Sequence, residues 1–178
     1  RVRYWEPKFH IDPYHTEEYF LVETRRLIED SIRIQMRSDV PVGAYLSGGL
    51  DSSIVTGFAA RAYKGGRFKT FTGAFDEGPQ FDERPYARAV AESVNAEMHT
   101  IIPSANDFAD VLQKLVYHMD EPVAGPGPFP QYMVLRCASQ HVKVVLGGQG
   151  GDEIFGGYTR YLVAYLEQAL KGAIFETT

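Results

Sequence analysis

The chain has 178 residues, of which 44% are hydrophobic and 23% are charged, the balance of a globular protein with a substantial core. Its net charge of −5 disfavours nonspecific nucleic-acid binding, no apolar run approaches the ~20 residues that span a membrane, and the first residues show no signal peptide. A single cysteine, Cys137, excludes an intrachain disulfide and a cysteine-based zinc cluster. We interpret Cys137 as an inert core residue.

The predicted elements begin after an irregular lead-in, rich in aromatic residues and proline, over residues 1–15. A long helix is expected over residues 16–37, with Thr16 as its cap. Its apolar residues recur at helical spacing and predict one buried face; they are Phe20, Leu27, Ile28, Ile32 and Met36.

Strands and helices alternate along the rest of the chain. We expect strands over residues 42–46, 69–75, 97–102 and 142–146. Helices are expected over residues 52–63, 83–93, 104–119 and 158–170, with a loop over 121–130 and a further helix before the last strand. In the helix over 104–119 the predicted buried stripe consists of Phe108, Leu112, Leu115 and Met119.

This alternation predicts an α/β fold, a parallel sheet with helices on both faces. Ligands bind such sheets beyond the carboxyl ends of the strands, near the point where the strand order reverses. Residues that directly follow a predicted strand are therefore the first place to look for a site.

The segment after the first strand reads Ser-Gly-Gly-Leu-Asp-Ser-Ser, at residues 47–53. The glycines allow the backbone to approach an anion, and the serines can open a helix whose unpaired N–H groups favour negative charge. This combination predicts a phosphate site, and the missing lysine of G-x-x-x-x-G-K-[ST] excludes a Walker A loop. The alternative is a glycine turn stabilised by serine and aspartate, which the strand and helix on either side disfavour.

A second glycine-rich segment, residues 147–158, follows the last predicted strand and has six glycines in twelve residues. Such a segment is costly in chain entropy and is explained by close approach to a ligand. It also carries Asp152 and Glu153, and the first segment carries Asp51. Carboxylates beside phosphate need a cation between them, which predicts an Mg²⁺ site with water completing the coordination. The alternative is a flexible acidic turn.

Together these two segments resemble the synthetase domain of glutamine-dependent asparagine synthetases. Residues 39–43, 81–91 and 117–122 support the resemblance. The first motif recurs in GMP, NAD and argininosuccinate synthetases, whereas the second is narrower. The implied fold is that of the adenine nucleotide alpha hydrolase-like PP-loop ATP pyrophosphatases.

The resemblance implies that ATP and Mg²⁺ bind at the sheet edge. Aspartate would be activated as β-aspartyl-AMP with release of pyrophosphate, and ammonia, derived from glutamine in the full enzyme, would then give asparagine. It assigns Asp51 and Asp152 to Mg²⁺, and Asp51, Gln149 and Asp152 to catalysis. The positions it assigns to ATP are Tyr45, Leu46, Ser47, Gly48, Gly49, Leu50, Asp51, Ser52, Ser53, Gly73, Gly147 and Gly148.

Gln149 departs from the family pattern, which has a glutamate important for adenylate formation there. A neutral amide can orient a group but cannot act as a base. This leaves the acceptor and the amine open. The alternatives are a related adenylate-forming synthetase, of the β-lactam or peptide cyclase type, and a nucleotide-binding module without catalysis.

The resemblance also implies the surroundings of the domain. Residues 1–15 resemble the connection after an N-terminal glutaminase domain, and residues 16–178 a synthetase domain truncated on its C-terminal side. We expect a cytoplasmic protein whose partners are small molecules and that glutaminase domain, with no nucleic acid or membrane. Homodimer formation stays open, and we expect the isolated chain to be inactive.

Two further groups of polar residues have less specific patterns. His99, His118 and His141 lie on different predicted elements without metal-ligand spacing, so we expect structural or surface roles. Four carboxylates flank the loop after the second strand and are candidates for supporting roles near the site; they are Asp76, Glu77, Asp82 and Glu83.

Overall fold

The computed structural model describes residues 2–6, 12–76, 78, 80, 82–121 and 125–175. Its sheet has the strand order β3-β2-β1-β4, and every pair is parallel. Because β2 and β3 lie on one side of β1 and β4 on the other, the strand order reverses between β1 and β4. The strands are β1 (Val42–Tyr45), β2 (Lys69–Gly73), β3 (Glu97–Ile101) and β4 (Val144–Leu146).

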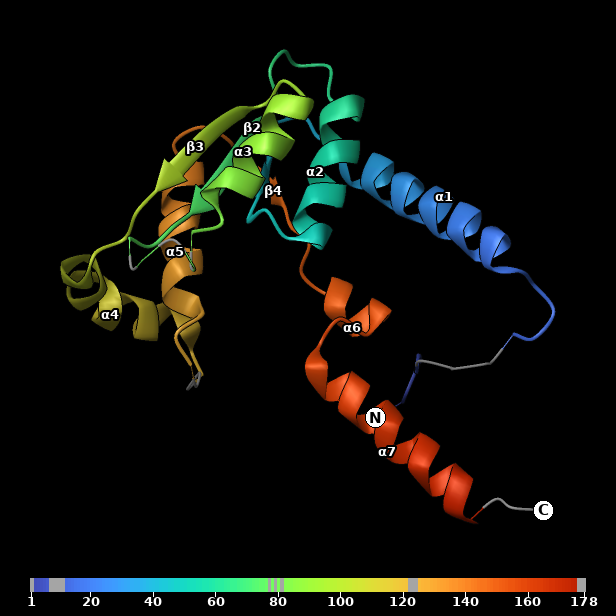
Figure 1. Cartoon of the computed structure of the whole chain (residues 1–178). Helices are drawn as coiled ribbons and strands as arrows, with labels where there is room; N and C mark the ends of the chain where they lie inside the picture. Colours follow the sequence, from blue (N-terminus) through green and yellow to red (C-terminus); the bar gives the residue numbers. More distant parts are fainter. Residues whose placement is uncertain are drawn as a thin grey trace.

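Helices cover both faces of this sheet, so the α/β fold predicted from the sequence is confirmed (Figure 1). On one face α2 contacts β1 and α3 contacts β2 and β3, while α1 packs against α2. On the other face α5 contacts β2 and β3, and α4 packs against α5. The helices in the described residues are α1 (Glu17–Gln35), α2 (Leu50–Ala62), α3 (Arg84–Ser93), α4 (Ala105–Met119), α5 (Pro128–Ala138), α6 (Gly151–Phe155) and α7 (Thr159–Phe175).

The strand residues alternate between these two faces, as a sheet buried on both sides requires. Ala44 packs toward α1 and α2, and Leu46 packs against Ala87 and Ala91 of α3. Phe71 faces the other way, into a cluster with α5. Cys137 is half-buried against that cluster and burial raises the pKa of its thiol, which agrees with an inert core residue.

Helix termini follow local sequence signals. The Thr16 hydroxyl accepts a hydrogen bond from the N–H of Tyr19 at 3.3 Å, so the predicted cap of α1 is confirmed. Ser104 and Asp107 form a capping box at the start of α4. The loop predicted over residues 121–130 is shorter than expected, because Pro128 opens α5 in the first-turn position that suits proline; residues 122–124 lie outside the described part.

Two predicted buried faces are wrong in detail. On α1, Phe20 and Leu27 are 44% and 54% exposed and Ile32 is the buried residue, because α1 rests on α2 along a narrow seam. On α4, Phe108 and Leu112 are exposed and Val111 is buried, because the contact with α5 falls along a different line of the helix. Helical spacing identified both helices but not which part of each apolar face is covered.

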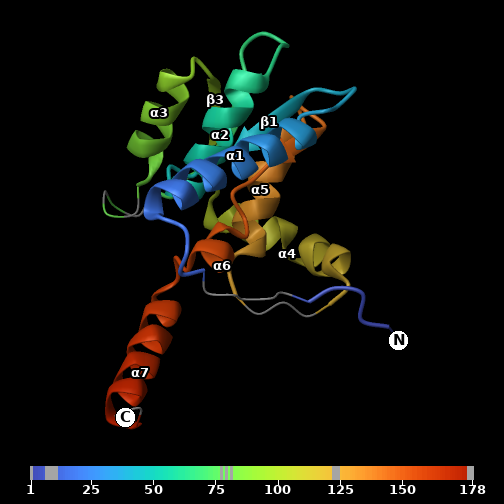
Figure 2. The same ribbon diagram turned by 90° about the vertical axis from the view of Figure 1, so that its right-hand side faces the viewer.

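The end of the chain leaves the body of the fold. After β4, α6 lies beyond the carboxyl edge of the sheet and α7 extends away from it (Figures 1 and 2). No side chain described in α7 is buried. None of the helices in the described residues is both long and apolar enough to cross a membrane.

Candidate functional site

The end of β1 is fixed to β2 at Leu46. Its N–H donates to the carbonyl of Phe71 at 3.0 Å, and its own carbonyl accepts from the buried hydroxyl of Thr72 at 2.7 Å. The Leu46 side chain is fully buried. Leu46 can therefore offer a ligand only its backbone, and the chain beyond it leaves the sheet at a defined point.

The loop over residues 47–53 is closed by its own hydrogen bonds. The Ser47 and Ser52 hydroxyl oxygens lie 3.0 Å apart, and Ser47 Oγ accepts from the N–H of Gly49 at 3.3 Å. The hydroxyls of Ser52 and Ser53 donate to the Gly49 carbonyl at 3.1 and 2.7 Å. The loop thus has a defined shape that does not depend on a ligand.

The N-terminus of α2 presents unpaired backbone donors at this loop. Gly49 is the N-cap and supplies no side-chain cap, and the first helical bond runs from Ser53 N–H to the Gly49 carbonyl at 3.1 Å. The N–H groups of Leu50, Asp51 and Ser52 precede that bond, and no described residue accepts from them. Together with the helix dipole they favour an anion.

Gly48 shows why the first motif needs glycine at this position. Its φ is +92°, and a Cβ built there would lie 2.8 Å from Tyr86 Cβ, 2.9 Å from Ala87 N and 3.0 Å from Glu83 O. Any side chain would therefore be strained and would collide with the first turn of α3. The position of the loop is set jointly by β1 and by α3.

The second glycine-rich loop lies directly against the first. A Cβ built on Gly148 would lie 2.7 Å from Ser52 N and 2.8 Å from Asp51 Cβ, and one on Gly151 would overlap the Asp51 carboxylate. The two segments are about a hundred residues apart in sequence, and they meet because β4 pairs with β1. The structure thus joins the two predicted loops at the reversal point of the sheet.

Two carboxylates belong to this junction. The Asp51 carboxylate lies against the backbone of Gly151, and Asp152 is the next residue of α6. The Asp152 carboxylate in turn lies against the backbone of Gly157. Both aspartates are partly buried.

The two carboxylates supply oxygen ligands, which is the ligand type that Mg²⁺ takes. The described residues contain no group of three or more histidine, cysteine or acidic side chains placed to hold a metal ion. Two carboxylates leave most of an octahedron to phosphate oxygens and water, which is how Mg²⁺ is commonly held in nucleotide sites. Asp51 and Asp152 are the residues that would hold it.

The positions predicted to line the nucleotide lie around the same edge. A Cβ built on Gly147 would lie 3.4 Å from the ring of Tyr45, which is half-buried, and burial raises the pKa of its hydroxyl. Gly73 ends β2, two residues beyond the partner of Tyr45, Phe71. A Cβ on Gly73 would lie 2.8 Å from Val134 Cγ2, so glycine there also lets α5 pack closely.

Gln149 is exposed in the turn of the second loop, between Gly148 and Gly150, and Gly150 has a φ of +94°. Nearby, the Tyr158 hydroxyl donates to Glu153 at 2.9 Å, which raises the pKa of Tyr158.

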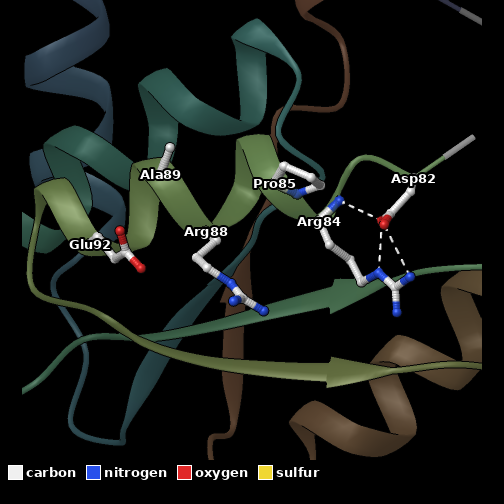
Figure 3. A pocket seen from close by; sticks show the side chains of 6 residues that line it. All are labelled: Asp82, Arg84, Pro85, Arg88, Ala89 and Glu92. Carbon is white, nitrogen blue, oxygen red and sulfur yellow. Dashed lines mark hydrogen bonds and ion pairs between the residues drawn. The ribbon is translucent and has the colours of Figure 1, made fainter. Parts of the chain in front are cut away.

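A cavity of about 440 Å³ lies along α3 (Figure 3). It is lined by Asp82, Arg84, Pro85, Arg88, Ala89 and Glu92. Arg84 forms ion pairs with both Asp82 and Asp76, so two of the four carboxylates predicted to flank the β2 loop have a defined partner. Glu77 lies outside the described residues.

One cluster was missed by sequence reasoning. The rings of His99 on β3 and His141 before β4 stack with centroids 4.0 Å apart, although they are far apart in sequence. Nε2 of His99 lies 3.0 Å from Glu97 Oε1 without the geometry of a hydrogen bond. Burial and the neighbouring His141 lower the pKa of His99. The packing of α5 on β2 and β3 brings these rings together, because His141 lies in the turn after α5, and sequence spacing did not reveal this packing.

Comparison with known proteins identifies relatives over most of the chain. The Asparagine synthase family model matches residues 23–174. A putative glutamine-hydrolyzing asparagine synthetase of Mycobacterium tuberculosis is 43% identical over 163 residues, covering 90% of this chain and 24% of that protein. Glutamine-hydrolyzing asparagine synthetase 1 of Bacillus subtilis is 41% identical over 155 residues, covering 86% and 24%.

The chain therefore spans about a quarter of the length of these relatives. Among solved structures, an NH3-dependent NAD synthetase from Campylobacter jejuni is similar, with a TM-score of 0.50 and 16% identity over 79% of this chain and 62% of that one. That likeness supports the PP-loop fold.

Proposed function

The chain belongs to the asparagine synthase family, and we propose that it is the ATP-binding, amide-forming part of a synthetase. In the full-length protein a substrate carboxylate would attack the α-phosphorus of ATP, breaking the α–β phosphoanhydride bond and releasing pyrophosphate. Ammonia would attack the acyl carbon, AMP would leave with the C–O electron pair, and the nitrogen would lose a proton. We propose aspartate as the carboxylate, β-aspartyl-AMP as the intermediate and asparagine as the product.

The contact between the two loops is the observation that carries this proposal. Backbone of Gly148 and Gly151 lies against Asp51 and Ser52, so the acidic second loop lies next to the unpaired amides of α2. A phosphate chain bound to those amides would lie beside two carboxylates. That arrangement suits a metal-bound polyphosphate and would be costly for a bare anion.

In this proposal the residues have separate roles. The N–H groups of Leu50, Asp51 and Ser52, with the serine hydroxyls of the first loop, bind the departing pyrophosphate. Tyr45, Gly73 and Gly147 line the AMP part. When bound to Asp51 and Asp152, Mg²⁺ would neutralise charge that develops on the leaving group.

The proposal also covers the nitrogen source and the cellular location of the full-length protein. The relatives are named as glutamine-hydrolyzing. We propose that a glutaminase domain of the same full-length protein supplies ammonia, and that residues 1–15 connect to it. A cytoplasmic location and an isolated chain that binds nucleotide without turnover belong to the same proposal.

A second candidate function rests on Gln149. Its exposed amide stands in the loop that would face the acceptor and cannot serve as a general base. A related synthetase that activates another carboxylate, or closes a ring with an internal amine, would be compatible with the same ATP site.

ATP–pyrophosphate exchange by the full-length protein, measured with aspartate and a panel of other carboxylates, tests both candidates. We expect aspartate-dependent exchange that falls about a hundredfold or more in Asp51→Asn and Asp152→Asn. Asp110→Asn, at an exposed position on α4, is the control and should leave the rate unchanged. If the folded protein shows no ATP–pyrophosphate exchange with any carboxylate of the panel, an adenylating function is contradicted.

The acceptor is decided by comparing the native protein with Gln149→Glu in the same assay. Exchange with another carboxylate in place of aspartate would support the second candidate. Efficient aspartate-dependent exchange, with the same acceptor preference in both proteins, would remove it.

A further inference from the structure

Arg84, the first residue of α3, pairs with two carboxylates of the loop that precedes it. Its Nε donates to Asp82 Oδ1 at 2.7 Å, one terminal nitrogen donates to Asp82 Oδ2 at 3.0 Å, and that same nitrogen donates to Asp76 Oδ1 at 3.0 Å. The backbone N–H of Arg84 also donates to Asp82 Oδ1 at 3.0 Å. One side chain therefore joins the loop after β2 to the start of α3. Figure 3 shows its pairing with Asp82.

This arrangement replaces an ordinary helix cap. The N-cap residue of α3, Glu83, makes no side-chain cap, and Asp82 instead accepts the N–H at the helix start. The Arg84 and Asp82 side chains are 28% and 24% exposed, so the paired charges are largely shielded. The hydrogen bond from Arg84 lowers the pKa of Asp82. The first turn of α3 thus depends on a planar guanidinium held by two carboxylates.

The same turn supports the first loop of the site. Around Gly48 the nearest atoms belong to Glu83, which precedes Arg84, and to Tyr86 and Ala87, which follow it within one turn. One turn later, Ala87 and Ala91 pack on Leu46, where β1 ends. A shift or rotation of the start of α3 would therefore move the backbone of residues 46–48, next to the unpaired amides of α2.

We propose that Arg84 is a positioning residue for ATP: held by Asp76 and Asp82, it fixes the first turn of α3 and thereby the loop at Gly48 that receives the phosphates. This rests on the proposed function of the loop. Arg84 also offsets two carboxylates near a site for a polyanion, so its loss both releases the loop and leaves those charges uncompensated. The acceptor and ammonia do not need this contact.

The test measures KM values of the full-length protein for ATP, the acceptor and ammonia in Arg84→Gln, Arg84→Lys and Arg88→Gln. We expect Arg84→Gln to raise the KM for ATP about tenfold, with the other two KM values unchanged. Arg84→Lys should raise the KM for ATP by a smaller factor than Arg84→Gln does, because lysine keeps the charge but not the planar fork of hydrogen-bond donors. Arg88→Gln is the matched control, since Arg88 lines the same cavity and no described carboxylate pairs with it.

Asp76→Asn provides a milder variant if Arg84→Gln does not fold. Asp76 is 63% exposed, and its loss should raise the KM for ATP by a smaller factor in the same direction. An unchanged KM for ATP in a folded Arg84→Gln protein, or an equal rise in Arg88→Gln, would overturn the inference. If the native protein shows no ATP-dependent exchange, the proposed function fails first, which separates the two outcomes.

Discussion

The two loops of the site differ in what holds them. The first, residues 47–53, is anchored to β2 through Leu46, closed by serine hydrogen bonds and packed on α3. In the second, residues 147–158, the backbone hydrogen bonds that the structure describes join no residue of the sheet, and its contacts outside the loop include Tyr45, Asp51 and Ser52. The first loop is shaped by the fold, and the second is shaped by the first.

This difference suggests that the two loops contribute differently to ligand binding. Six glycines give the second loop a high entropy cost of ordering, and neither α6 within it nor α7 after it buries a described side chain. A ligand bound to the first loop would supply the contacts that the fold itself does not. We therefore expect changes in the first loop to abolish binding and changes in the second to weaken it.

Gly48→Ala should have the largest effect. A side chain at a φ of +92° is strained, and its Cβ would approach backbone atoms of α3 that cannot move independently. We expect the chain to lose about 1–3 kcal/mol of unfolding free energy and the full-length protein to lose ATP–pyrophosphate exchange.

Gly57→Ala is the matched control for that variant. Gly57 lies inside α2 with nothing within 4 Å of a built Cβ, so alanine should stabilise the chain by about 0.5–1 kcal/mol. Urea denaturation measures both variants. Equal stability of Gly48→Ala and the native chain would show that α3 does not constrain the loop.

Gly151→Ala should have a smaller effect. Its Cβ would overlap a carboxylate, which can rotate away, in place of a backbone atom. We expect the free energy of unfolding to change little and the Mg²⁺ concentration for half-maximal exchange to rise about tenfold, because Asp51 loses its position. A Mg²⁺ requirement identical to that of the native protein would argue against Asp51 as a metal ligand at this junction.

Lowering the pH should have the smallest effect on stability, and it should affect the surroundings of the two loops unequally. Burial, then the neighbouring His141, lowers the pKa of His99, with Lys69 adding to this and Glu97 opposing it. The unfolded chain therefore binds more protons than the folded chain as the pH falls below about 6.5, so the free energy of unfolding decreases.

Because His99 lies on β3 and stacks on His141 just before β4, amide protection should fall first in residues 97–101 and 141–146 and later in residues 47–53. Hydrogen exchange, corrected for intrinsic rates, measures this order. The variant His99→Gln should not show the early loss of amide protection. If the same early loss of protection occurs in that variant, His99 is not its cause.

Much of this fold and part of the site could be predicted from the sequence, because the signals are local. Glycine beside a strand end and the serine and threonine caps act within a few residues, and they correctly placed both loops and the start of α1. The parallel arrangement followed from the alternation of elements. The meeting of the loops followed once both were assigned to the carboxyl edge of one sheet.

What could not be predicted depends on packing between distant elements. The buried line of α4 is Val111 because of where α5 lies, and helical spacing alone does not reveal that. The stacking of His99 on His141 and the support of Gly48 by α3 require the strand register and the helix position. The pairing of Arg84 with Asp76 and Asp82 likewise emerged only with the loop conformation.

Hydrogen exchange of the 178-residue chain with millimolar ATP, with and without Mg²⁺, tests most directly whether the two loops form one ATP site. We predict that ATP protects the amides of residues 50–52, and that Mg²⁺ is needed for protection to extend to residues 148–152, since Asp51 and Asp152 meet the phosphates only through the metal. Absence of protection at residues 50–52, or protection there with no change in the second loop when Mg²⁺ is present, would contradict the account.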